Sequence, residues 1–139
     1  YKAPFQMGNS ELKAVAILNG EKGATLQERF GLVKKGWKVT GKTSQSLAID
    51  LGSQQTVSGF AFTPQKQGGK GTVAGIIRIS NDGKNWKEVE RFEFGNLIND
   101  PSKRYHHFKQ TVKARYVQVE AAEIAARTEA AALAEIDIF

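Results

Sequence analysis

The sequence predicts an all-β domain, a sandwich or jelly roll built from short strands. Apolar and polar residues alternate with a period of two in several segments between residue 47 and the end of the chain, which is typical of half-buried strands. Turn-forming residues separate these segments at short intervals. The 139 residues are enough for one domain with a real core, and the sequence contains no internal repeat.

Each alternating segment places its apolar residues on one face. These residues are the predicted core: Leu47, Ile49, Leu51, Phe60, Phe62, Ile77, Ile79, Phe92, Phe94, Val117, Val119, Ala121, Ile136 and Ile138. Gly52-Ser53 is predicted to turn the chain, and Pro64 to end a strand. The stretch SNDGKNW at 80–86 predicts a hairpin, because Asp-Gly tolerates the positive φ that such turns need. It does not fit a calcium loop, because Lys84 and Trp86 occupy positions that need oxygen ligands.

Three segments are harder to assign. SELKAVAIL at 10–18 is compatible with a short helix that its first serine caps and that ends at Asn19-Gly20. Residues 19–46, rich in Gly, Lys and Thr, are predicted to form a long surface loop, a kind of segment that is often functional. Residues 120–136 favour a helix by propensity, but the strands elsewhere favour an all-β fold in which 122–131 form a loop.

Composition limits the function classes. The chain has no cysteine, which excludes disulfides, thiolate catalysis and zinc-thiolate sites. Its net charge of +6 raises the question of nucleic acid, but the lysines are scattered, most densely at Lys34, Lys35, Lys38 and Lys42, and no nucleic-acid motif accompanies them. We therefore expect no nucleic acid, and no membrane because no apolar run approaches a span. A start at Tyr1 without a signal peptide predicts a processed chain or one cut from a larger protein.

Catalysis is not expected. His106 and His107 are neighbours in a predicted strand, so they point to opposite faces and cannot form one site. The sequence has no G-x-S-x-G nucleophile motif. Glu88 and Glu90 are predicted to share one strand face, where charged residues usually form a solvated surface.

An ordered set of motifs carries a family resemblance. They are IDLG at 49–52, Thr63-Pro64, a Gly-rich loop at 68–71, Ser80, DG-x-x-W at 82–86, ARYV at 114–117 and AEIDIF at 134–139. In this order they resemble the discoidin domain, also called the coagulation-factor type C (F5/8 type C) domain. The resemblance covers roughly residues 15–139. It implies an eight-stranded, galactose-binding-domain-like jelly-roll β-sandwich, one domain over 1–139, with Trp86 packed on the core at a strand start.

A further stretch narrows the resemblance. LNGEKG at 18–23 and GLVKKGWKVTG at 31–41 are similar to the opening of discoidin-like domains appended to bacterial glycoside hydrolases, in particular at the C-terminal end of Bacteroides-type β-hexosaminidases (chitobiases). Such domains are classed with the family 32 carbohydrate-binding modules. This implies a non-catalytic accessory module, monomeric when isolated, that binds terminal galactose or N-acetylhexosamine weakly. It would belong to a secreted, periplasmic or cell-surface bacterial glycosidase, with a catalytic domain in the same chain.

Two other functions stay open at this point. One is a structural module that docks on a neighbouring catalytic domain. The other, from the wider discoidin family, is a cell-surface protein-interaction domain. Fold alone does not choose among them.

The resemblance also implies a structural Ca²⁺ site. Positions that match the family's ligands are Asn19, Glu21, Thr25 and Glu135. They depart from the family, because Asn19 replaces an Asp, Glu21 is longer than Asp and Thr25 is shifted by one residue. The alternative is that Asn19-Gly20 is a plain turn and Glu135 an exposed strand residue.

The sugar site that the resemblance implies lies in loops at one end of the sandwich. Sugars are held by an aromatic face and by hydrogen bonds to hydroxyls. One loop supplies Arg29, Phe30 and Trp37, and a second supplies Gln65 and Lys66, with Gln65 where galactose-binding relatives carry Arg. The third loop, IAARTEAAA, has no aromatic residue. The two loops around residues 26–38 and 64–71 are expected to meet at one end, unless Trp37 is instead a core residue.

Overall fold

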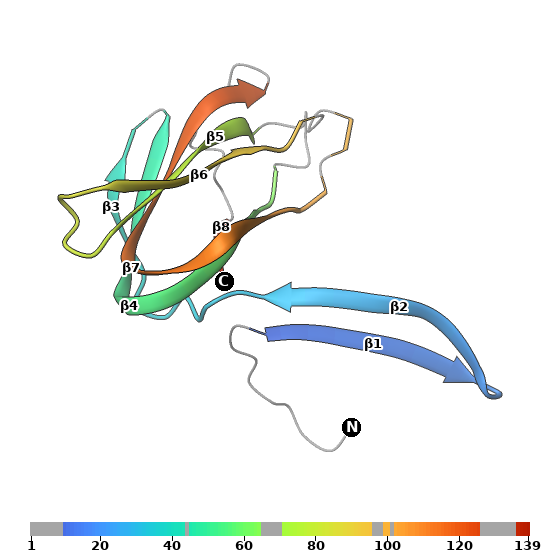
Figure 1. Cartoon of the computed structure of the whole chain (residues 1–139). Coiled ribbons are helices and arrows are strands. Elements are labelled where there is room, and N and C mark those ends of the chain that lie inside the picture. Colours follow the sequence, from blue (N-terminus) through green and yellow to red (C-terminus); the bar gives the residue numbers. More distant parts are fainter. Residues whose placement is uncertain (1–9, 44, 65–70, 96–98, 101, 126–135) are drawn as a thin grey trace.

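The computed structural model describes residues 10–43, 45–64, 71–95, 99–100, 102–125 and 136–139. Within these ranges the chain forms strands and no helix (Figure 1). The strands are β1 (Ser10–Leu18), β2 (Glu21–Phe30), β3 (Lys38–Lys42), β4 (Ser46–Phe62), β5 (Gly71–Ser80), β6 (Lys87–Glu93), β7 (Arg104–Ala125) and β8 (Ile136–Ile138). The all-β prediction is confirmed, and the described residues contain no helix that could span a membrane.

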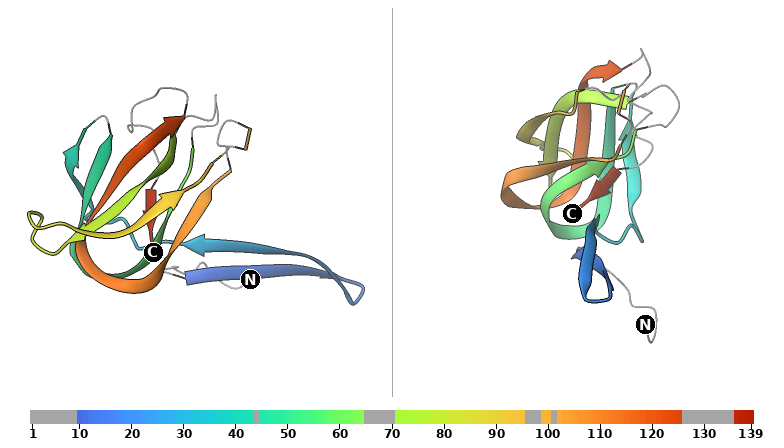
Figure 2. Two further views of the ribbon diagram at one scale, coloured as in Figure 1. Left: turned by 45° about the horizontal axis from the view of Figure 1, so that its top comes forward. Right: turned by 90° about the vertical axis from the view of Figure 1, so that its right-hand side faces the viewer.

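The strands of the described chain form two sheets. β1 and β2 make a separate antiparallel hairpin, and the other six strands follow the order β3-β4-β7-β5-β6, with β8 added on β4. Figure 1 shows the hairpin projecting from the body that the other strands form. The larger sheet curves over itself, so that β4 and β7 contribute to both layers of a sandwich (Figure 2).

The first bend of this sheet lies in β4. Asp50 and Gln55 pair with the residues on either side of Arg115 in β7, so residues 51–54 lie opposite Arg115 alone. Such a large bulge, with four residues opposite one, bends the strand and increases its twist. Gly52 accommodates the bend because its φ is 84°, a left-handed value that favours glycine.

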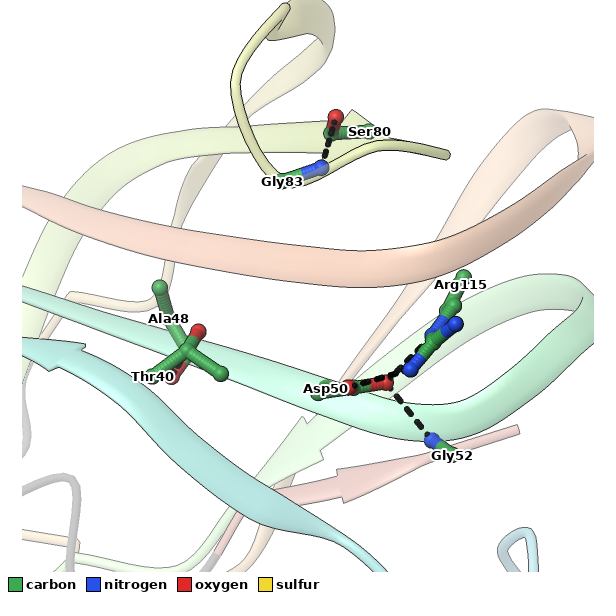
Figure 3. Close-up of polar contacts among 7 residues, drawn as sticks. All are labelled: Thr40, Ala48, Asp50, Gly52, Ser80, Gly83 and Arg115. Carbon is green, nitrogen blue, oxygen red and sulfur yellow. Dashed lines mark hydrogen bonds and ion pairs between the residues drawn. The ribbon is translucent and has the colours of Figure 1, made fainter.

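A carboxylate holds this bend. Asp50 accepts two hydrogen bonds of 2.9 Å from the Arg115 guanidinium and one of 2.8 Å from the Gly52 backbone N–H (Figure 3). The Arg115 hydrogen bond lowers the pKa of Asp50, against the opposing effect of its burial. Asp50 of the IDLG motif and Arg115 of the ARYV motif therefore belong to one structural contact.

The second bend lies in β7. Val57 and Gly59 of β4 pair with residues on either side of 108–111, so these four residues lie opposite Ser58 alone. The excursion carries Phe108 into the core. β8 lies on the other side of β4 here and pairs with residues 60–62.

The core lies between the two layers. Phe60, Phe62 and Ile77 are fully buried. Phe60 meets Phe92 edge to face, with ring centroids 5.0 Å apart, and Phe92 lies 5.0 Å from Phe94. Such aromatic pairs add stability beyond the burial of their area. The predicted core faces are confirmed: every residue that the period-two pattern assigned to the core belongs to this cluster or packs against it.

The N-terminal segment differs from its prediction. Residues 10–18 form β1 instead of a short helix, and most of the expected loop at 19–46 consists of β2 and β3. Asn19 and Gly20 have φ values of 51° and 84°, the combination that a tight two-residue hairpin turn requires. The strand pairing that this turn closes overrides the helix propensity of Leu and Ala.

The hairpin presents an apolar face to solvent. Paired residues share a face, so Leu12, Ala14, Leu26 and Phe30 lie together; we call this set the hairpin face. Leu26 is 66% exposed. The opposite, more polar face carries Glu11 and Gln27, which line a cavity of about 270 Å³ with Tyr105 and His107 of β7. The polar face thus lies toward the sandwich and the hairpin face away from it.

Two further expectations meet the structure in part. Residues 120–125 continue β7 as a strand, so this part of the segment is not helical, and 122–125 are not the expected loop. The remainder of that loop lies outside the described residues. The stretch 80–86 joins β5 to β6 as predicted, with Asp82 Oδ1 accepting hydrogen bonds from the backbone N–H groups of Lys84 and Asn85.

Core and hairpin substitutions should differ sharply in cost. Phe60→Ala should lower the free energy of unfolding by about 3–5 kcal/mol, because it leaves a cavity among packed aromatic rings. Leu26→Ala should change it by less than about 0.5 kcal/mol, because the side chain is exposed. Urea unfolding of both variants measures the contrast. A large loss for Leu26→Ala would contradict the exposed position of the hairpin.

Asp50→Asn should destabilise the chain in a pH-dependent manner. Because the folded-state pKa of Asp50 is lowered, its contribution is present above the unfolded pKa of about 4 and is lost as the pH falls through the folded value. The stability difference between wild type and Asp50→Asn should therefore be larger at about pH 7 than at about pH 3. Urea titrations at both pH values test this, and an unchanged difference would show that the charge does not hold the bend.

Candidate functional site

A cleft of about 350 Å³ lies where the segment after β2 passes the bend of β4. We call it the Trp37 cleft. It is lined by Leu32, Val33, Lys35, Trp37, Leu51, Gly52, Ser53 and Gln55. Its position follows from the fold, because the Asp50 contact with Arg115 and Gly52 sets the path of the chain at this bend.

Contacts with the C-terminal strand hold the segment that carries Trp37. The Leu32 backbone N–H donates to the Ile138 carbonyl at 2.6 Å. Lys34 Nζ lies 2.6 Å from Asp137 Oδ1 and 5.9 Å from the centre of the Trp37 ring. Burial raises the pKa of Asp137, but Lys34 and Lys103 outweigh it and the net shift is downward. The Trp37 ring is therefore positioned by a charged network as well as by the core beneath it.

Polar groups surround the ring. Lys35 supplies an ammonium group, and Ser53 and Gln55 supply a hydroxyl and an amide that are themselves joined by a 2.7 Å hydrogen bond. An aromatic surface with donors and acceptors beside it is the combination that binds a sugar ring through its C–H face and its hydroxyls. The half-buried Trp37 serves both as a wall of the cleft and as a neighbour of the core.

The structure describes three of the five residues predicted to bind sugar. Phe30 lies at the end of β2 on the hairpin face, Arg29 belongs to β2, and Trp37 lines the cleft. Gln65 and Lys66 lie outside the described residues.

The expected meeting of the two loops stays a prediction, because residues 65–70 lie outside the described residues. The segment with Trp37 meets the bend of β4, because β2 leads directly to that end of the sandwich. Ser53 and Gln55 were missed as site residues. The only signal for them was a run of polar residues directly after the turn at Gly52.

Three of the four predicted calcium ligands lie on the hairpin. Asn19 and Glu21 are at the tip of the hairpin, Thr25 pairs with Val15 within it, and Glu135 lies outside the described residues. About 30 Å of extended strand separates the tip from Phe30, which lies at the base of the hairpin. The described residues contain no group of three His, Asp or Glu side chains placed to hold a metal. The calcium site stays a prediction.

Comparison with solved structures places the fold among known modules. The module CBM32-5 of a Clostridium perfringens GH89 protein, in complex with GalNAc-β-1,3-galactose, has a TM-score of 0.56 and 20% identity over 68% of this chain and 64% of that chain. A Bacteroides ovatus protein assigned as an α-L-fucosidase has a TM-score of 0.64 and 28% identity, covering 86% of this chain and 21% of that chain. This chain thus spans about a fifth of that protein.

A third structure bears on the narrower resemblance. The C-terminal domain of a chitobiase from Bacteroides fragilis has a TM-score of 0.61 and 16% identity, covering 78% of this chain and 96% of that domain. The likeness to chitobiase C-terminal domains is thereby confirmed in the fold. No match was found among curated proteins. The family model of the F5/8 type C domain matches residues 7–136, and the chain belongs to this family.

Proposed function

We propose that this domain is a non-catalytic carbohydrate-binding module of a bacterial glycoside hydrolase, and that it binds terminal galactose or N-acetylhexosamine weakly. The observation that carries the proposal is the Trp37 cleft, where an indole ring lies beside Lys35, Ser53 and Gln55. The likeness to a module in complex with GalNAc-β-1,3-galactose supports the choice of sugar. The likeness to a chitobiase domain supports a β-hexosaminidase as the parent enzyme.

The affinity of such a cleft is low. A cleft of about 350 Å³ is near the lower limit of ordinary ligand sites, so it buries only one sugar unit and few contacts offset the entropy of binding. Retention on a glycan then depends on avidity with a catalytic domain in the same chain or with a multivalent glycan. In this proposal the parent enzyme acts in the periplasm, at the cell surface or outside the cell, where such glycans occur.

Tryptophan fluorescence provides a direct test. The chain has two tryptophans, so Trp86→Phe leaves Trp37 as the single reporter. Titration of this variant with galactose and with N-acetylgalactosamine should change its emission with a dissociation constant on the order of 1 mM. Gln55→Ala in the same background should weaken binding about tenfold, the effect of one lost hydrogen bond of about 1.4 kcal/mol.

A neighbouring residue supplies the control. Gln54 is exposed, contacts Asn81 and does not line the cleft, so Gln54→Ala should leave sugar binding unchanged. An emission that neither sugar changes up to high concentration, or equal losses from Gln54→Ala and Gln55→Ala, would reject the Trp37 cleft as the sugar site.

A second candidate function is docking on a neighbouring domain. The specific observation is the hairpin face, which lies away from its own sandwich and exposes Leu12, Leu26 and Phe30. A two-stranded ribbon is marginal in water, and a contiguous apolar surface usually marks an interface. A domain of the same parent protein is the favoured occupant, because this chain spans only about a fifth of the α-L-fucosidase chain that it resembles.

Hydrogen exchange distinguishes this candidate. In the isolated chain the amides of β1 and β2 should exchange much faster than those of β4, because no described residue covers the hairpin face. In the longer parent protein the hairpin amides should become protected if the hairpin face is docked, and Leu26→Ser should remove that protection. Hairpin amides that exchange equally fast in both proteins would reject docking.

A further inference from the structure

A second groove lies apart from the Trp37 cleft. It has a volume of about 560 Å³ and runs between β6 and the first half of β7. Its lining consists of Ile79, Lys87, Glu88, Val89, Glu90, Arg91, Lys109, Gln110 and Val112. It shares no residue with the Trp37 cleft and uses different strands.

The excursion of β7 creates one wall of this groove. Residues 108–111 leave the ladder with β4, so Lys109 and Gln110 lie at an open edge between the two layers. The Lys109 backbone N–H donates to the carboxylate of Glu90 on β6. Bulges of this kind occur often beside functional sites, because they redirect side chains.

A second irregularity lies in β6, in the wall of the groove. On β5, Ile77 pairs with Glu90 and the next residue pairs with Glu88, so Val89 is an extra residue in β6. Glu88 and Glu90 both line the groove, but Glu90 is largely shielded from solvent, contrary to the predicted solvated surface. Glu88 contacts Arg91 at 3.1 Å in an exposed position, whereas only 14% of the Glu90 side chain is exposed.

Glu90 is a fixed acceptor inside the groove. One carboxylate oxygen accepts from the Lys109 N–H, and the other lies 3.2 Å from Nε2 of His106. The Lys109 N–H hydrogen bond is the largest of the influences that lower the pKa of Glu90, so the carboxylate is ionised at neutral pH. Each oxygen retains a second lone pair that can accept from a ligand hydroxyl.

Lys87 and Lys109 supply positive charge, whereas Glu88 and Arg91 form an exposed ion pair with each other. Within the described residues, the side chains of Lys87 and Gln110 form no hydrogen bond or ion pair, and the Lys109 ammonium has only a long-range interaction with Glu90. Three apolar side chains, Ile79, Val89 and Val112, also line the groove and pack against the core. The groove thus combines the Glu90 acceptor, two ammonium donors, an exposed Glu88–Arg91 ion pair that is internally neutral, and an apolar wall.

We propose that this groove is a second ligand site, and that it binds an acidic sugar unit, a uronate or a sulfated hexose. The ligand's anionic group pairs with Lys87 and Lys109, its hydroxyls donate to Glu90, and its C–H surface lies on the apolar side chains. A neutral sugar leaves both ammonium groups without a counter-charge. A small anion without hydroxyls meets repulsion from Glu90. The described lining contains no aromatic ring, so charge rather than stacking provides the selectivity.

NMR titration of the chain tests the site with four probes: glucuronate, galactose 6-sulfate, neutral galactose and inorganic sulfate. Backbone amides of β6 and of residues 109–112 should shift with glucuronate, galactose 6-sulfate or both, and the two arms distinguish a carboxylate from a sulfate ligand. Galactose and inorganic sulfate should leave these amides unshifted. Raising the salt concentration should weaken the binding of the acidic sugars, because salt screens partly exposed ion pairs.

Matched lysine variants test the mechanism. Lys87→Gln and Lys109→Gln should each raise the dissociation constant of the acidic sugar about tenfold, because each removes one charge-assisted contact. Lys84→Gln removes the same charge from the adjacent loop without lining the groove and should have little effect. Binding of galactose at the Trp37 cleft should be unchanged in all three variants, so the two sites succeed or fail separately.

The proposal has clear contrary outcomes. Equal losses of affinity in Lys84→Gln and Lys109→Gln would show that binding of the acidic sugars depends only on net charge. Equal shifts with galactose would show a neutral sugar site, and equal shifts with inorganic sulfate would show a simple anion site. The absence of shifts with both acidic sugars would reject the groove as a ligand site. Each of these results overturns the assignment.

Discussion

The structure depends on two long strands that bend at different residues. β4 leaves the ladder at residues 51–54 and β7 leaves it at residues 108–111. The two strands therefore pair in one layer, bend, and pair again in the other layer. Asp50 stabilises the first bend through Arg115, with a paired charge and a backbone N–H in one contact. A sheet that folds over itself in this way encloses an aromatic core without any helix in the described chain.

Both candidate sites lie beside these bends. The Trp37 cleft uses the residues that leave the ladder in β4, and the second groove uses those that leave it in β7. A regular ladder presents its backbone groups to the neighbouring strand and its side chains to the two faces. An interruption of the ladder frees backbone groups and redirects side chains. In the second groove, Glu90 accepts a hydrogen bond from the freed N–H of Lys109. The fold therefore provides recognition surfaces at the points where its own pairing is interrupted.

The sequence predicted the sandwich well and its polar sites poorly. Strand faces such as that of Phe60 and Phe62 follow from a strict period of two, which a buried face enforces. That same rule placed Glu90 on a solvated surface, whereas its side chain is only 14% exposed beside the extra residue Val89, and no residue type marks this bulge. Ser53 and Gln55 were missed for a similar reason: their position in the cleft depends on long-range pairing between strands distant in sequence.

The hairpin shows a different limit. Asn19-Gly20 is a strong hairpin signal, but the flanking residues Leu, Ala and Glu are good helix formers, and residues 10–18 were assigned accordingly. A turn signal decides the structure only when the strands it joins have a surface to pair with or to cover. In the described chain the hairpin face has no such surface, so local sequence rules give little weight to the strand alternative.

Charge separates the surfaces that suit different partners. Residues 10–30 contain three acidic and three basic residues, so the hairpin is neutral and the net charge of +6 belongs to the rest of the chain. A neutral, apolar ribbon suits a protein surface, where unpaired charge would be costly to bury. A positive sandwich attracts acidic ligands over a distance of about one Debye length, roughly 8 Å in physiological salt. The hairpin can therefore be covered by a neighbouring domain without reducing the positive field around the two grooves, and docking and glycan binding are compatible functions of one domain.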